Sequence, residues 1–227
     1  MTSKSAPMLA ALLARAKPSS LCWLCHEPAS AALCQCCLHD LPDLGRCCQR
    51  CGEPGPSPCK HCRQRPPTVD RLVAGYRYGP PLDRALQAFK HHRQWWLDAM
   101  LCQPLLARLQ EQPQPECLVP VPLHWRRRLW RGFNQAELIA RQLGNALALP
   151  VNCHLCRRHR ATARQQGQSR RQRLSNLNGA FSLSGPVPEH VAIVDDVVTT
   201  GSTVNLLAKL LKAHGCQQVQ VWCLARA

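Results

Sequence analysis

The pattern of hydrophobic and polar positions changes near residue 68, and from there the chain alternates between runs of strand length and runs of helix length. Apolar runs of strand length cover 72–78, 117–121, 191–194 and 219–224, with a weaker one at 151–156. Apolar residues at helical spacing cover 82–90, 95–109, 132–149 and 204–214, with a break or kink expected at Pro104. Strands separated by helices predict an α/β fold with a parallel sheet, right-handed crossovers and flanking helices.

Residues 1–66 lack this alternation and divide into two regions. An apolar run at 8–14 is followed at once by Arg15 and Lys17, which predicts a short helical leader over 1–20 rather than a secretory signal. Residues 21–66 are rich in Cys, Pro and Gly, and cannot form a hydrophobic core unaided. The pair Pro66-Pro67 marks the expected boundary with an α/β domain over 68–227. No stretch approaches the ~20 apolar residues of a membrane span, and we expect a cytoplasmic protein.

Ten of the sixteen cysteines lie between Cys22 and Cys62. They include four Cys-x-x-Cys pairs: Cys22/Cys25, Cys34/Cys37, Cys48/Cys51 and Cys59/Cys62. Two such turns complete a tetrahedral zinc site, so the eight thiolates predict two structural Zn²⁺ ions in a double zinc ribbon over 21–66. Sequential pairing gives the shortest loops, interleaved pairing stays open, and the neighbouring Cys36 and Cys47 make the register ambiguous. A disulfide framework is the alternative, but it is typical of secreted chains.

The formal net charge is +16, and 23 of the 29 basic residues are Arg. The planar guanidinium binds phosphate through two parallel hydrogen bonds, so this composition favours polyanionic partners, either nucleic acid or small phosphorylated ligands. Basic residues also surround the last cysteine pair. The cysteine module is therefore either a structural staple or, in addition, a docking surface for nucleic acid or protein.

The segment VAIVDDVVTTGST at 191–203 joins an apolar strand to two carboxylates, a hydroxyl-rich loop and a helix. Its candidate ligand-binding residues are Asp195, Asp196, Thr199, Thr200, Gly201, Ser202 and Thr203. Carboxylates where the strand leaves a parallel sheet can accept hydrogen bonds from ribose hydroxyls or reach Mg²⁺ indirectly. The loop offers hydroxyl and N–H groups, and the helix N-terminus favours a phosphate. An ordinary strand–turn–helix connection with an Asp turn and a Thr N-cap would explain the two carboxylates alone or the hydroxyl-rich loop alone. It does not explain both in one segment.

This segment resembles the signature by which type I phosphoribosyltransferases bind 5-phosphoribosyl-1-pyrophosphate (PRPP). In that fold the pyrophosphate loop follows an upstream strand end, which here holds Val121, Pro122, Leu123 and His124. The arginines beyond it are candidate phosphate or nucleic-acid contacts: Arg126, Arg127, Arg128 and Arg131. The resemblance therefore implies a ligand made of Mg²⁺ and PRPP, or another ribose 5-phosphate group.

The cysteine module, VPVPLHWRRRLWRGFNQAEL, the stretch 165–181 and VAIVDDVVTTGST together resemble the ComF/GntX family over about 21–227. This family comprises phosphoribosyltransferase-like proteins linked to competence and DNA utilisation. A further similar segment, LQAFK at 86–90, adds Lys90 as a candidate phosphate contact. The resemblance implies handling of single-stranded DNA together with competence or DNA-processing proteins. Three interpretations stay open: a DNA-handling factor, a transferase acting on an unnamed nitrogen acceptor, and a PRPP-sensing regulator.

Overall fold

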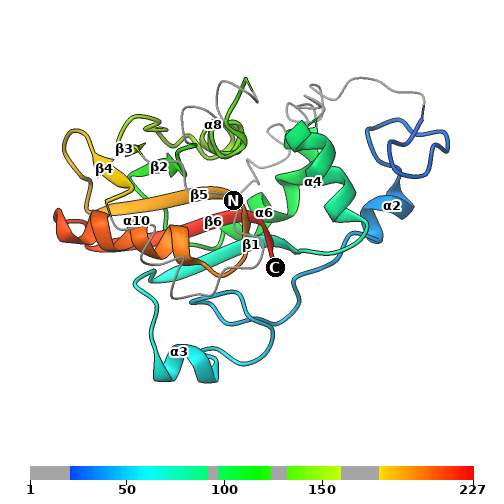
Figure 1. Ribbon diagram of the computed structural model, residues 1–227. Helices are drawn as coiled ribbons and strands as arrows, with labels where there is room; N and C mark the ends of the chain where they lie inside the picture. Colours follow the sequence, from blue (N-terminus) through cyan, green and yellow to red (C-terminus); the bar gives the residue numbers. More distant parts are fainter. Residues whose placement is uncertain (1–20, 92–96, 124–131, 160–178) are drawn as a thin grey trace, which may run out of the picture.

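The computed structural model describes residues 21–91, 97–123, 132–159 and 179–227, and a four-stranded parallel sheet forms its centre (Figure 1). The strand order is β1-β6-β5-β2. The strands are β1 (Arg71–Arg77), β2 (Cys117–Pro120), β5 (His190–Val198) and β6 (Gln218–Arg226). Ile193 of β5 lies opposite Val119 of β2 on one side and Val221 of β6 on the other. The parallel sheet predicted from the sequence is confirmed.

Helices cover both faces of this sheet, because successive side chains of each strand point to opposite sides. They are α4 (Leu82–His91), α5 (Leu97–Leu101), α6 (Gln103–Leu109), α8 (Gln135–Leu147) and α10 (Ser202–Ala213). Leu118 and Trp222 pack in one core with α4, α6 and α8. Their neighbours Val119 and Val221 pack in a second core with α10. The alternation along each strand thus builds a three-layer α/β domain.

Two predicted elements differ in the structure. The break or kink expected at Pro104 within 95–109 is a break at Cys102, and Pro104 lies in the first turn of α6, where the missing N–H of proline has no cost. The weak strand expected at 151–156 is reduced to a single bridge from Val151 to Leu118. Instead β3 (Cys156–Arg158) pairs antiparallel with β4 (Phe181–Leu183) in a separate two-stranded sheet.

The cysteine module packs against the α/β domain in two separate places. Its short helices are α2 (Gln35–His39) and α3 (Lys60–Gln64), and Figure 1 shows α2 beside α4 and α3 below β1. Leu33 and Leu41 of the first half are buried in the same core as α4. In the second half, Gln49 O accepts a hydrogen bond of 2.8 Å from Leu72 N of β1. The first half therefore shares an apolar core with the domain, and the second half is joined to it by backbone hydrogen bonding.

Two predictions about the N-terminal part of the chain have different outcomes. The leader expected over 1–20 lies outside the described residues. Within the ranges that the structure describes, no helix is both long and apolar enough to cross a membrane.

Candidate functional site

The two adjacent carboxylates lie inside β5, whereas the sequence pattern placed them where the strand leaves the sheet. The strand continues to Val198 because β6 keeps pairing with it, with Val197 opposite Ala225. Asp195 Oδ1 accepts a hydrogen bond of 2.9 Å from Asp196 N, and Asp196 Oδ1 accepts one of 2.7 Å from Val197 N. Both side chains are half-buried. These backbone donors hold the carboxylates at the carboxyl edge of the sheet, where α/β proteins bind ligands.

A small hollow lies directly after these carboxylates. Its volume is about 50 Å³, and it is lined by Asp195 and residues 197–204. Gly201 precedes α10 with a φ of +69°, a conformation that residues with a Cβ adopt at a cost. Thr200 Oγ1 lies 2.8 Å from Ser202 Oγ. The structure thus gathers one carboxylate, the hydroxyl-rich loop and the first turn of a twelve-residue helix around one point, an arrangement suited to a phosphate.

The candidate pyrophosphate loop begins beside β5. Val121 N donates a hydrogen bond of 2.8 Å to Val194 O, so the residues that follow β2 start next to the strand that carries the carboxylates. Val121 is buried, and Pro122 and Leu123 are half-buried. The remaining candidates of this region are His124, Arg126, Arg127, Arg128 and Arg131, and they lie outside the described residues. The same is true of the Lys90 side chain, although its backbone belongs to α4.

Asn134 connects this loop to α8, a role that the sequence showed only as one letter of a family-like segment. Its Nδ2 donates to Val121 O over 3.0 Å, and its Oδ1 accepts from Ala136 N over 3.2 Å. Asn134 is therefore both the N-cap of α8 and a buried tie to the loop. Beside it, the Phe133 ring lies 6.4 Å from that of Phe89 in α4.

The eight predicted zinc ligands form two sequential groups of four. Cys22, Cys25, Cys34 and Cys37 make one group, and Cys48, Cys51, Cys59 and Cys62 make the other. All sulfur atoms within a group lie within 4.8 Å of one another. The distance from Cys25 Sγ to Cys34 Sγ is 3.7 Å, as is that from Cys51 Sγ to Cys59 Sγ. Tetrahedral Zn–S bonds of about 2.3 Å separate sulfur atoms by about 3.8 Å, so both groups fit Zn²⁺.

Backbone donors favour negative charge on one sulfur atom of each group. Burial raises the pKa of the Cys22 thiol, but hydrogen bonds from the backbone of Cys25, Cys34 and Leu24 outweigh it and lower the pKa to about 6. The Cys48 thiol of the other group is held at about 6 against burial in the same way. Four adjacent thiolates repel one another, so they ionise together only around a cation. Cys36 and Cys47 belong to neither group.

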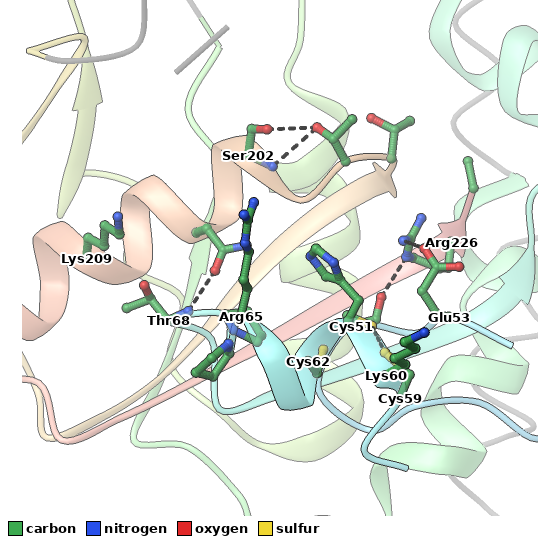
Figure 2. Close-up of a pocket in the computed structure, with 17 residues that line it drawn as sticks. Cys51, Glu53, Cys59, Lys60, Cys62, Arg65, Thr68, Ser202, Lys209 and Arg226 are labelled. Atoms are coloured by element: carbon green, nitrogen blue, oxygen red, sulfur yellow. Dashed lines mark hydrogen bonds and ion pairs between the residues drawn. The ribbon is translucent and has the colours of Figure 1, made fainter. Parts of the chain in front are cut away.

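A larger cleft, which the sequence did not reveal, lies between the second cysteine group and the hydroxyl-rich loop 199–203, called the phosphate loop below (Figure 2). Its volume is about 860 Å³. Arg226 at the end of β6 closes one side of it: its Nε donates to Cys51 O over 2.6 Å, and its Nη1 donates to Val198 O over 3.4 Å. The same guanidinium forms an ion pair with Glu53. The cleft is therefore framed by contacts between distant segments, and no local pattern indicates it.

Comparisons with known proteins agree with this architecture. A model of the phosphoribosyl transferase domain family matches residues 130–227. The chain is 42% identical to the DNA utilization protein YhgH of Salmonella typhi over 220 residues, 91% of this chain and 96% of that protein. It is 40% identical to the Escherichia coli K12 protein of the same name over the same shares. Competence protein F of Haemophilus influenzae is 38% identical over 179 residues, 74% of this chain and 78% of that protein.

The two YhgH relatives each match 91% of this chain, and the domain family model covers the segment from the carboxylates to α10. The four-stranded parallel sheet with its flanking helices has the phosphoribosyltransferase-like architecture that the domain match indicates. The chain therefore belongs to the ComF/GntX family of competence and DNA-utilisation proteins, which carry a phosphoribosyltransferase-like domain.

Proposed function

We propose that this protein handles single-stranded DNA in competence or DNA utilisation, and that its α/β domain binds PRPP with Mg²⁺. The observation that carries the ligand assignment is the hollow at the end of β5, where Asp195 faces the hydroxyl-rich loop and the start of α10. The names of the relatives support the role in DNA handling. We place the protein in the cytoplasm, where thiols stay reduced and available to zinc.

The chain's own residues divide the ligand between them. The 5-phosphate accepts hydrogen bonds from the N–H and hydroxyl groups of residues 199–203 at the positive end of the α10 dipole. The ribose hydroxyls donate to Asp195, with Asp196 beside it in the strand. The diphosphate extends toward the loop that starts at Val121, next to β5. Mg²⁺ bound to the diphosphate neutralises its charge, and both cysteine groups hold structural Zn²⁺.

Titration with Mg·PRPP by calorimetry tests the ligand assignment. A carboxylate that accepts hydrogen bonds contributes about 1.5–3 kcal/mol, so Asp195→Asn raises the Kd roughly 10- to 100-fold. Asp196→Asn has a smaller effect, because Asp195 is the carboxylate that lines the hollow. The matched control is Glu111→Gln, which removes one exposed negative charge outside the site. Unchanged binding of Mg·PRPP in both aspartate variants would contradict the assignment of the ribose phosphate site.

The carboxylate pair also favours a second function, phosphoribosyl transfer. In this reaction a nitrogen nucleophile displaces pyrophosphate from C1 of PRPP, and the protein contributes positioning and charge stabilisation. Pyrophosphate release is measured with a panel of nucleobases and amines. Release that depends on an acceptor and is lost in Asp195→Asn establishes the transferase, whereas binding without release by any of them leaves the DNA-handling function alone.

A further inference from the structure

The cleft beside the second cysteine group adjoins the candidate phosphate site. Thr199, Thr200 and Ser202 line both the cleft and the hollow at the end of β5. The opposite wall comes from α3 and the residues that follow it, up to Thr68. Asn205 of α10 joins the two walls, because its Oδ1 accepts a hydrogen bond of 2.9 Å from Thr68 N. The cleft is thus a fixed feature where the cysteine module meets the α/β domain.

Positive charge dominates the lining of this cleft. The basic side chains are Lys60, His61, Arg65, Lys209 and Arg226. Glu53 is the one acidic side chain among the lining residues that the structure describes, and it is already paired with Arg226. Lys60, Arg65 and Lys209 are exposed and form no ion pair within the described part of the chain. Like charges that converge on a cleft repel one another and favour an anionic ligand.

The arrangement of these cations fits an extended anion. In Figure 2, Lys209 and Lys60 lie toward opposite ends of the pocket, and Arg65 lies between them, directed from α3 toward the phosphate loop. Among the described residues that line the cleft, none carries a Phe, Tyr or Trp ring on which a base could stack. The cleft does offer hydroxyl, amide and basic groups, and such groups contact phosphates and sugars without reading sequence.

From this geometry we infer that the cleft binds the sugar-phosphate backbone of single-stranded DNA, with Lys60, Arg65 and Lys209 as its phosphate contacts. The inference rests on the proposed function in DNA handling and assigns the DNA-binding site to this cleft. The second cysteine group acts in binding as well as in folding, because Lys60 lies in α3 and Arg65 directly follows that helix. The strand passes next to the loop that holds the ribose phosphate ligand, so the two ligands lie side by side.

Salt-dependent binding of a fluorescent oligothymidylate to the full-length, zinc-loaded protein tests this inference. Single-strand binding weakens with salt by about 0.7 units of log K per unit of log salt concentration for each phosphate contact. The triple variant Lys60→Gln, Arg65→Gln, Lys209→Gln therefore binds more weakly at low salt, with a slope shallower by about 2. The matched control is Arg63→Gln, Arg84→Gln, Arg157→Gln, which removes the same charge from exposed positions outside the cleft.

The control triple keeps the wild-type slope, although its Arg63 lies on the same helix as Lys60 and two residues before Arg65. Thermal unfolding and zinc content confirm that both triples stay folded, as expected for exposed side chains. Equal salt slopes for the wild type and the cleft variant would overturn the proposal that DNA binds in the cleft. Equal losses of affinity in the cleft triple and the control triple would overturn it as well. If the wild type itself binds no oligothymidylate at low salt, the DNA-handling function fails instead.

Discussion

Asn134 shows how much one side chain contributes to the position of the candidate pyrophosphate loop, which starts at Val121. It caps α8 through Ala136 N and holds Val121 O at the start of the loop, and the side chain is almost fully buried. A buried amide with both ends satisfied fixes geometry, because each lost hydrogen bond leaves a desolvated group behind. The sheet thus places the loop beside β5, and Asn134 links it to the helix that follows.

Replacing Asn134 tests this link by equilibrium urea unfolding. Asn134→Ala removes the helix cap and the donor to Val121 O, so the free energy of unfolding falls by about 2–3 kcal/mol. Asn134→Asp keeps an oxygen for Ala136 N and loses only the amide donor, so it falls by about half as much. An alanine variant as stable as the wild type would show that the loop is held by other contacts.

At the scale of elements, the zinc content of single-cysteine variants tests which cysteines belong to each group of four. Cys25→Ser and Cys59→Ser each remove one ligand of a different group, so each variant retains about one zinc ion where the wild type holds two. Cys36→Ser and Cys47→Ser are the matched controls, because these thiols lie next to ligands but outside both groups. Metal content is measured by mass spectrometry on purified protein. Loss of zinc in either control would mean that the register is shifted.

The elements of the parallel sheet were predictable because strands buried on both faces are continuous apolar runs, as in 191–194. The end of β5 was placed too early because Asp195 is polar, although pairing with β6 keeps it in the sheet. β4 was missed because three residues are too few to show a period. The sequence left two alternatives for the cysteine grouping, sequential and interleaved. The structure has the sequential one, in which each half of the module packs on a different part of the domain.

The cleft was not predictable, because its walls come from α3, the phosphate loop and the end of β6. Its residues meet only when the cysteine module docks on the sheet edge. The positive charge was visible in the composition, but its place was not. Motifs therefore predicted a ligand chemistry within single segments, and only the tertiary structure showed that two of these segments line one cleft.

At the scale of the whole molecule, Arg226 joins the second cysteine group to the phosphate loop. Its side chain is only 10% exposed and contacts Cys51 O, Glu53 and Val198 O, which directly precedes the loop. Gly52 leaves room for it, since a Cβ there would lie 2.9 Å from Arg226 Cγ. One guanidinium thus contacts both the second cysteine group and the residue before the loop, and outer contacts of this kind hold metal ligands in place.

Arg226→Lys tests this coupling through the release of zinc to a coloured chelator. An ammonium group cannot reproduce the guanidinium fork, so zinc leaves the second group faster while the first group releases it at the wild-type rate. A Cys25→Ser background, which retains only the second zinc, assigns the accelerated phase. Arg77→Lys is the matched control, because Arg77 lies opposite Arg226 at the end of β1 and is exposed. Wild-type release by Arg226→Lys in that background would show that the module folds around its metal independently of the domain.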